Sequence, residues 1–259
     1  MDLHLKGKVI IVTGGSKGIG YGICEQLIKE DAIPVIVGRN KETISQAVEV
    51  LKTSGGKVGY AYAELSDPDA CKNAVEQIKN EYGLIDGLVN NAGINDGVSL
   101  ETGDFEAFTQ SIHRNLTHYY MMAHLCLPAL KKSKGAIVNI GSKTSITGQG
   151  GTSGYAAANG GRNALTREWA VELLPYSVRV NAVIVAESYT PLYQKWIQTF
   201  PDPVQKLHEI ESRIPLENRM TTPKEIGSTV CFLLSDQSSH TTGQLLFVDG
   251  GYTHLDRSL

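Results

Sequence analysis

Cysteine is scarce in this 259-residue sequence, and its four copies, Cys24, Cys71, Cys126 and Cys231, lie far apart. Disulfide frameworks and metal-binding cysteine motifs need closer or repeated spacings. The sequence therefore predicts buried free thiols and no metal site. It also favours a reducing compartment, and we expect the protein to be cytoplasmic.

Long apolar runs and an excess of basic residues are also missing. No apolar stretch approaches the length that crosses a bilayer, so we expect no membrane association. The residues from Met1 to Leu5 include an acidic side chain and lead into a strand pattern, so we expect no signal peptide. Lysine and arginine number 24 against 27 acidic residues, which argues against a nucleic-acid partner.

Short apolar segments alternate regularly with segments of helical spacing. The apolar segments predict seven strands, at Lys8–Thr13, Ile33–Val37, Gly59–Ala63, Gly87–Asn90, Ala136–Ile140, Val178–Val185 and Leu245–Val248. A helix is predicted after each of the first five strands, including one over Phe105–Leu130 with an interruption near Pro128. No low-complexity linker or repeat is present. The pattern predicts an α/β fold, a single Rossmann-type domain over residues 1–259 with a doubly wound parallel sheet of about seven strands.

Residues 189–220 break this alternation, because four prolines lie there among aromatic and charged residues. Long irregular segments in compact domains are usually functional. We predict a small helical lid over the site, with a packing or subunit-contact segment as the alternative. Tyr193 and Trp196 in it could pack on a sugar face or form the core of the lid.

A glycine-rich turn follows the first predicted strand and opens the first predicted helix. Its glycines allow the backbone to turn tightly and approach a pyrophosphate, which the free N–H groups of the helix N-terminus can bind. The turn predicts a dinucleotide site that includes Gly14, Ser16, Lys17, Gly18, Ile19 and Gly20.

The end of the second predicted strand bears on the choice of dinucleotide. An acidic residue there would bind the ribose 2′-hydroxyl of NAD(H), but the sequence has Gly38-Arg39-Asn40. Arg39 and Lys17 could both pair with a 2′-phosphate, which favours NADP(H) over NAD(H). Alternatively, Arg39 stacks on the adenine of either cofactor.

Further motifs occur in a characteristic order: Asn90-Asn91-Ala92-Gly93, then Asn115, Ser142, Tyr155 and Val248-Asp249-Gly250-Gly251. With the loop from Thr13 to Gly20, they make the sequence resemble the short-chain dehydrogenase/reductase family along nearly its whole length. Within that family, the stretches around Gly154-Tyr155, Ala164–Ala170 and Ser239–Gly243 most resemble sugar dehydrogenases of the L-fucose dehydrogenase type. The resemblance implies an NAD(P)-dependent oxidoreductase acting on a CH–OH group of a small substrate, assembled as a homotetramer.

The resemblance also implies roles for individual residues. Tyr155 exchanges the substrate proton, Ser142 holds the substrate oxygen, and Asn115 holds a helix kink and a proton-relay water. Glu64 and Leu65 lie by the adenine, Asn91, Ala92 and Gly93 flank the cofactor, and Thr190 contacts the carboxamide. A phenol titrates near 10 when unperturbed, so it needs positive charge nearby to act as a base at neutral pH.

The sequence departs from the family pattern four residues after Tyr155, where the family has lysine and this chain has Asn159. Positions four apart share a helix face, so we expect Asn159 to point into the site and bind the cofactor ribose. Asparagine carries no charge. An opposite charge within ~4–6 Å shifts a pKa by about 1–3 units, so its loss would slow the reaction by about one to three powers of ten. Lys143 is a candidate to compensate.

A second departure follows the sixth predicted strand, where Val185-Ala186-Glu187 stands in place of the usual Pro-Gly. Glu187, Asn95 and Gln149 fall on loops that should surround the substrate together with Ser142 and Tyr155. Polar side chains suit a sugar better than a steroid or an acyl chain.

Three functions remain open from the sequence. The first is oxidation of an L-fucose-like aldose to its lactone. The second is a reaction of another small alcohol or ketone. The third is cofactor binding with weak catalysis, because of Asn159. In each case we expect a homo-oligomer, with residues 252–259 as candidates to reach a neighbouring subunit.

Overall fold

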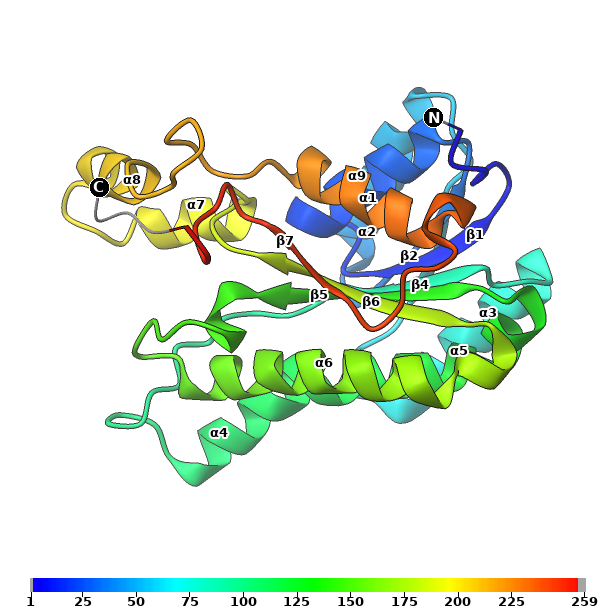
Figure 1. The fold of residues 1–259 in the computed structure, drawn as a ribbon, viewed down its shortest axis with the longest axis horizontal. Helices are drawn as coiled ribbons and strands as arrows, with labels where there is room; N and C mark the ends of the chain where they lie inside the picture. Colours follow the sequence, from blue (N-terminus) through cyan, green and yellow to red (C-terminus); the bar gives the residue numbers. More distant parts are fainter. Residues whose placement is uncertain (1, 256–259) are drawn as a thin grey trace.

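The computed structural model describes residues 2–255. Seven parallel strands form one sheet in the order β3-β2-β1-β4-β5-β6-β7 (Figure 1). The strands are β1 Val9–Thr13, β2 Ile33–Gly38, β3 Gly59–Tyr62, β4 Gly87–Asn90, β5 Ala136–Ser142, β6 Arg179–Val185 and β7 Leu245–Val248. The strand order reverses between β1 and β4, and in such sheets ligands bind at the carboxyl ends of the strands beside this point.

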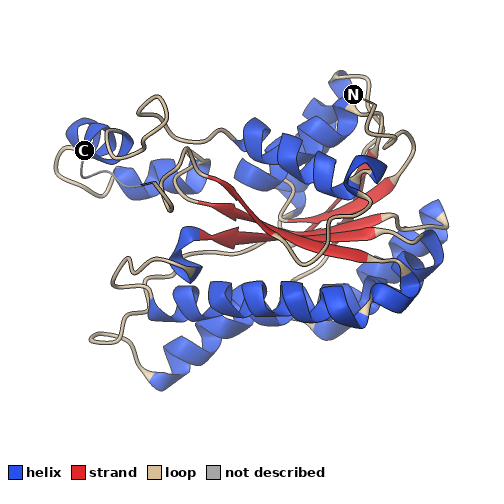
Figure 2. Ribbon diagram, viewed as in Figure 1, coloured by secondary structure: helices blue, strands red, loops and turns tan. Residues whose placement is uncertain are grey.

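Helices cover both faces of the sheet (Figure 2). One face carries α1 Gly18–Lys29, α2 Lys41–Thr53 and α9 Pro223–Leu234, and the other carries α3 Pro68–Tyr82, α5 His118–Ser133 and α6 Ser153–Glu172. Two buried clusters of aliphatic side chains fill the two interfaces. None of the described helices is long and apolar enough to cross a membrane. The predicted Rossmann-type sheet of seven strands is confirmed.

Local sequence explains these elements. Every residue of β1 is buried, as expected for a strand covered on both faces. Helix α2 begins at Asn40, whose side chain accepts a hydrogen bond of 2.9 Å from the Thr43 amide. It buries Ile44, Ala47, Val48 and Leu51, a stripe with helical spacing.

The long helix predicted over Phe105–Leu130 is interrupted in a different place. It consists of α4 Phe105–Ile112, a π-helical turn over His113–Thr117, and α5, which continues through Pro128. The break predicted near Pro128 is wrong. Pro128 and His124 are both exposed, so water can satisfy the His124 carbonyl that loses its helical partner.

Helix α9 is absent from the sequence prediction, although its start has a clear signal. Thr222 and Glu225 form a reciprocal capping box, and Pro223 occupies the first turn. The helix buries Ile226 and Val230 and packs along α1, so it contributes directly to the core.

Residues 189–220 contain two short helices, α7 Pro191–Ile197 and α8 Pro203–Glu211 (Figure 1). Both lie beyond the carboxyl ends of β5 and β6. The C-terminal segment expected to reach a neighbour includes residues 256–259, which lie outside the described residues.

Candidate active site

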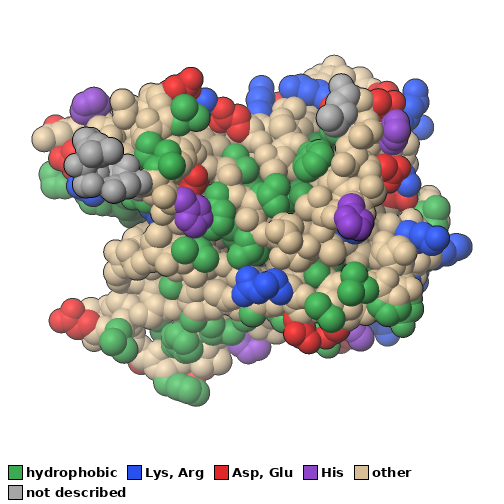
Figure 3. Space-filling model, in the orientation of Figure 1, with side chains coloured by type: hydrophobic (Ala, Val, Ile, Leu, Met, Phe, Trp, Pro, Cys, Tyr) green, Lys and Arg blue, Asp and Glu red, His purple; other side chains and the backbone are tan. Residues whose placement is uncertain are grey.

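A cleft of about 1100 Å³ lies at the carboxyl ends of the strands, beside the point where the strand order reverses. Its walls include the loops that follow β1 to β6, the π-helical turn and the start of α7. Figure 3 shows the molecule hollowed on this side, between the α7–α8 segment and the side that carries α4 and α6. The cleft is large enough for a dinucleotide and a small substrate together.

The loop after β1 presents backbone N–H groups to this cleft. Gly14 has a φ of +67°, a conformation that favours glycine. A Cβ on Gly20 would lie 2.4 Å from the Gly14 carbonyl oxygen, so only glycine allows the helix to approach the turn this closely. No side chain caps the N-terminus of α1, and its first turn holds no acidic residue. This end of the helix is therefore suited to an anion.

Thr13 and Asn91 hold the first and fourth loops together. The Thr13 hydroxyl accepts hydrogen bonds from the amides of Asn91 (2.9 Å) and Ala92 (3.1 Å), and Asn91 Nδ2 donates to the Thr13 carbonyl (2.9 Å). Asn91, Ala92 and Gly93 all line the cleft. These bonds fix the spacing between the two loops that would enclose a cofactor.

Arg39 and Glu64 form an ion pair of 2.9 Å at the far end of the cleft from Tyr155. Both side chains, Leu65 and Lys17 line this end. Burial opposes ionisation of Glu64, but hydrogen bonds from Arg39 and Ser66 outweigh it and lower the pKa of the carboxyl. Arg39 thus has a carboxylate partner when no phosphate is present.

Tyr155 and Ser142 line the other end of the cleft. Ser142 ends β5 and caps the following 3₁₀ turn, so its Oγ accepts from the Thr144 amide (3.3 Å) and hydroxyl (3.1 Å). Tyr155 lies in the first turn of α6 and is half-buried. The sequence predicted that these two residues meet, and the structure places both on the cleft wall.

Asn115 lies in the π-helical turn, where a helix kink was expected. Its Oδ1 accepts a 2.8 Å bond from the Ile94 amide, and its Nδ2 donates to the Ser111 carbonyl (3.1 Å). Its own carbonyl oxygen accepts a 2.7 Å bond from Arg162 Nε. Asn115 therefore ties the loop after β4 to α6, through its side chain and its carbonyl oxygen.

Asn159 does not line the cleft, although it shares a helix face with Tyr155. It is 0% exposed, and its Nδ2 donates to the Tyr155 carbonyl at 2.9 Å. Its Oδ1 accepts a 3.0 Å bond from Arg162 Nη1. Arg162, which the sequence analysis did not single out, lines the cleft instead. The available signal was a lone arginine within the small and apolar run from Ala156 to Leu165.

The predicted substrate residues separate into two groups. Asn95 lines the cleft, whereas Gln149, which lies exposed in a loop, and Glu187 do not. Glu187 forms an ion pair with the buried Lys143, whose ammonium also lies 4.1 Å from the centre of the Tyr252 ring. Because this carboxylate neutralises it, Lys143 is a poor source of the missing lysine charge.

Aromatic side chains in the segment 189–220 pack on one another. The ring centroids of Tyr193 and Trp196 are 5.1 Å apart and those of Trp196 and Phe200 are 5.0 Å apart, both edge to face. Tyr193 and Trp196 thus pack within their own segment, although Trp196 remains 44% exposed. Thr190 caps α7 and lines the cleft, and a Cβ on Gly18 would contact its side chain at 3.2 Å.

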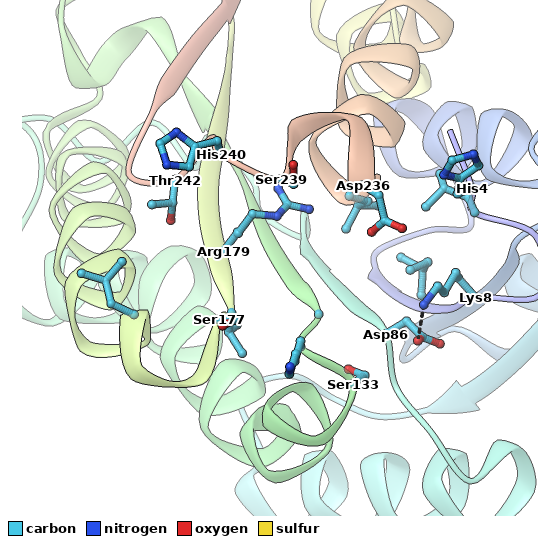
Figure 4. Close-up of a pocket in the computed structure, with 17 residues that line it drawn as sticks. His4, Lys8, Asp86, Ser133, Ser177, Arg179, Asp236, Ser239, His240 and Thr242 are labelled. Atoms are coloured by element: carbon cyan, nitrogen blue, oxygen red, sulfur yellow. Dashed lines mark hydrogen bonds and ion pairs between the residues drawn. The ribbon is translucent and has the colours of Figure 1, made fainter. Parts of the chain in front are cut away.

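A second cavity, of about 510 Å³, lies at the opposite edge of the sheet, where β1, β5 and β6 begin (Figure 4). Three of its charged side chains, Lys8, Asp86 and Arg179, have structural partners. Lys8 binds Asp86 at 3.3 Å, and Arg179 donates to the carbonyls of Leu233 (2.7 Å) and Ser235 (3.1 Å) near the end of α9. We infer that these contacts hold the first residues of the strands and the end of α9 together.

Comparisons with known proteins agree with this geometry. A family model described as enoyl-(acyl carrier protein) reductase matches residues 14–253. The chain belongs to the short-chain dehydrogenase/reductase family. It is similar to the crystal structure of Cj0485 dehydrogenase, with a TM-score of 0.94 and 46% identity over 100% of this chain and 99% of the other.

Other members of the short-chain dehydrogenase/reductase family differ in their substrates. The 3-oxoacyl-[acyl-carrier-protein] reductase FabG of Thermotoga maritima is 34% identical over 96% of this chain and 99% of its own. L-fucose dehydrogenase of Bos taurus is 32% identical over 97% of this chain and 91% of its own. The chain is thus an oxidoreductase that acts on CH–OH groups with an NAD(P) cofactor.

The residues present fit such a cofactor. The uncapped N-terminus of α1 and the close approach at Gly20 suit a pyrophosphate, and the loop at Asn91–Gly93 forms the opposite wall. No cluster of metal-binding side chains occurs among the described residues.

His118 makes stability depend on pH. It is 2% exposed, and burial, with a smaller contribution from Arg162, lowers its pKa to about 4. Unfolding restores an ordinary pKa near 6.5, so the unfolded chain binds an extra proton between these values. We expect His118 to remove about 1.4 kcal/mol of stability per pH unit as the pH falls from about 6.5 to 4.

Denaturant unfolding at a series of pH values measures this effect. The His118→Gln variant keeps a donor for the Arg114 carbonyl, which lies 3.1 Å from Nε2 of His118. The difference in unfolding free energy between the variant and the wild type should change by about 3 kcal/mol across the window. A difference that does not vary with pH would contradict the assignment.

Proposed function

We propose that this protein oxidises the anomeric hydroxyl of an L-fucose-like aldose to its lactone, with NADP⁺ as the preferred cofactor. The observation that carries the sugar assignment is the polar wall near Tyr155. Asn95 in the loop after β4, Gln110 in α4, and His113 and Arg114 in the π-helical turn all line the cleft. Side chains of this kind bind sugar hydroxyls, whereas an acyl chain or a steroid favours an apolar lining.

Two residues of the chain would perform the proton chemistry. Ser142 donates a hydrogen bond to the reacting oxygen and holds it as charge develops there. Tyr155, as the phenolate, takes the hydroxyl proton when the carbon–hydrogen bond breaks, and the phenol returns it in the reverse direction. When bound, the nicotinamide ring accepts the hydride. The lid helices α7 and α8 would limit access of water during this step.

A substrate panel tests this proposal. The purified protein is mixed with L-fucose, other aldoses and non-sugar alcohols, with each cofactor, between pH 6 and 10, and absorbance is followed at 340 nm. We expect turnover with L-fucose-like aldoses and none with the 1-deoxy analogue, which lacks the anomeric hydroxyl. Activity only with apolar alcohols or ketones would overturn the sugar assignment and leave the second candidate. Cofactor binding without turnover of any substrate would leave the third candidate, a cofactor-binding protein with weak catalysis.

The cofactor preference gives a separate prediction. Arg39 and Lys17 support a 2′-phosphate, but Glu64 competes for Arg39. We expect Glu64→Gln to tighten NADP(H) binding by about three- to tenfold, because an exposed ion pair contributes at most about 1 kcal/mol and a carboxylate repels phosphate. NAD(H) binding should change little. Fluorescence titration of both cofactors measures this.

Arg39→Ala is the matched variant in that titration. It should weaken NADP(H) binding by about tenfold or more and spare NAD(H). If both variants affect the two cofactors equally, Arg39 contacts the adenine rather than a 2′-phosphate, and the NADP(H) preference is wrong.

We also propose a homotetramer in the cytoplasm. The outer faces of α4, α5 and α6 expose large apolar side chains, including Phe105, Tyr120 and Val171. Apolar patches of this kind commonly mark contacts between proteins. Light scattering should give four times 28.0 kDa, about 112 kDa.

A further inference from the structure

Arg162 is a buried cation without an acidic partner among the described residues. It is 3% exposed, and it forms no ion pair with any carboxylate that the structure describes. Its hydrogen bonds all go to neutral oxygens. Nε and Nη2 donate to the Asn115 carbonyl, and Nη1 donates to the Ile140 carbonyl (3.1 Å) and to Asn159 Oδ1 (3.0 Å).

Such a charge is expensive to keep inside a protein, because burial disfavours the charged form. The two arginines that do form ion pairs, Arg39 and Arg219, are exposed, and both bind glutamates. A neutral side chain could cross-link the same oxygens at lower cost. The Tyr119 ring, whose centroid lies 4.2 Å from Cζ of Arg162, compensates part of this cost. An anion that forms beside the guanidinium during function would compensate more of it.

The partners of Arg162 direct its charge toward the reacting end of the cleft. Asn115 lies in the π-helical turn, Ile140 lies two residues before Ser142, and Asn159 is bonded to the carbonyl of Tyr155. On the other side, a Cβ on Gly93 would lie 2.9 Å from Nη2 of Arg162. The guanidinium thus lies between the helix that carries Tyr155 and the loop after β4, and it lines the cleft.

We propose that Arg162 supplies the fixed positive charge that stabilises the Tyr155 phenolate, in place of the lysine that Asn159 replaces. Arg162 follows Asn159 by three residues, so it lies on the same helix face, one turn farther along α6. Asn159 is then a positioning residue, because it accepts from the guanidinium and donates to the Tyr155 carbonyl. This inference rests on the proposed function, in which Tyr155 is the base.

Other ionisable groups near the cleft do not offer an equivalent charge. Lys143, in the turn after β5, is neutralised by Glu187 from the loop after β6. His118 at the start of α5 has a pKa of about 4, owing to burial and then to Arg162, so it is neutral near pH 7. His113 and Arg114 in the π-helical turn are exposed to solvent, and Asp96 accepts a 2.8 Å bond from Ser111. Tyr119 of α5 has a raised pKa of about 12 because it is buried.

The pH profile of turnover distinguishes an electrostatic role from a structural one. Arg162→Gln keeps donors for the carbonyls and removes the charge, whereas Arg162→Lys keeps the charge. In the oxidation direction, we expect the half-maximal pH of kcat to rise by about one to three units in Arg162→Gln and by less than about half a unit in Arg162→Lys. At neutral pH the glutamine variant should lose about 10- to 1000-fold in kcat, and most of it should return at high pH.

Moving the charge back to position 159 provides a rescue. The double variant Asn159→Lys/Arg162→Met carries one cation, as the wild type does, but three residues earlier. We expect it to recover at least tenfold in kcat at neutral pH over Arg162→Met alone. Asn159→Lys with Arg162 retained places two cations together and should gain nothing. If Arg162→Met does not fold, the comparison of glutamine with lysine at position 162 still shows whether the positive charge is required.

A readout independent of turnover comes from His118 in the protein without cofactor. Nuclear magnetic resonance follows the titration of its ring, and Arg162→Gln should raise its pKa above about 4 while Arg162→Lys should leave it near that value. Cofactor affinity, measured by fluorescence, should stay within about threefold in both variants, and circular dichroism should show a folded chain.

Two results would overturn the inference. One is a uniform loss of kcat at every pH in both single variants, which would indicate that Arg162 only holds the neighbouring segments together. The other is a wild-type pH profile in Arg162→Gln. Either result leaves the proposed function intact if the wild type oxidises its aldose. A wild type without turnover of any substrate would refute the proposed function first, and this inference with it.

Discussion

Tyr155→Phe is expected to reduce turnover by about a thousandfold, because it removes the phenolic oxygen that is proposed to exchange the substrate proton. Proton transfer by a positioned side chain contributes about 10²–10⁴-fold to an enzymatic rate. The phenyl ring fills the same space, so binding of the cofactor should change by less than about threefold. Steady-state kinetics and cofactor fluorescence on the same preparation measure the two effects.

The matched control is Tyr176→Phe. Tyr176 is exposed at the other edge of the sheet, where its ring lies 3.6 Å from the Lys131 ammonium. This variant should keep wild-type kinetics. If Tyr155→Phe retained more than a tenth of wild-type kcat, Tyr155 would not be the acid and base of this site, and the assignment of Arg162 would lose its basis.

Gly20→Ala is expected to weaken cofactor binding by about 10- to 100-fold. The added Cβ would lie 2.4 Å from the Gly14 carbonyl oxygen and 2.6 Å from Asn91 Nδ2. The first contact is with backbone, which cannot rotate away, so the turn must move from the N-terminus of α1. That movement separates the N–H groups that would bind the pyrophosphate.

Gly160→Ala is the control for this variant, because Gly160 also lies within a helix and a Cβ there meets nothing within 4 Å. It should leave cofactor affinity unchanged and stabilise the fold by about 0.4–1 kcal/mol through lower entropy of the unfolded chain. Isothermal calorimetry and thermal unfolding report both quantities. Equal affinities for the two variants would show that the turn tolerates displacement.

The sequence was sufficient to predict the sheet, because each strand is an apolar run with distinct boundaries. Strands buried on both faces, such as Val9–Thr13, need apolar residues at every position, and this signal does not depend on distant contacts. The tight glycine-rich turn after β1 was predictable for a similar reason. The positive φ of Gly14 and the tight approach at Gly20 restrict those positions to glycine.

Tertiary contacts explain what the sequence analysis missed. Helix α9 is the exception, because its capping box at Thr222 is a local signal that follows directly on the irregular segment 189–220, and no helix was predicted there. The groups that a long side chain contacts cannot be derived from its place in the sequence. Arg162 becomes informative only when the π-helical turn brings the Asn115 carbonyl within 2.7 Å of its guanidinium. Likewise, Lys143 could not be dismissed before its pairing with Glu187 was known.

The four cysteines provide a built-in reporter of unfolding. All four are free and buried, and burial raises the pKa of each thiol, to about 11 for Cys71 and about 12 for Cys126 and Cys231. Disulfide reagents attack thiolates, so the native protein should react with them very slowly at neutral pH. Because Cys24 and Cys231 lie in the core on one face of the sheet and Cys71 and Cys126 on the other, the number of thiols modified over time would distinguish the opening of one layer from loss of the whole fold.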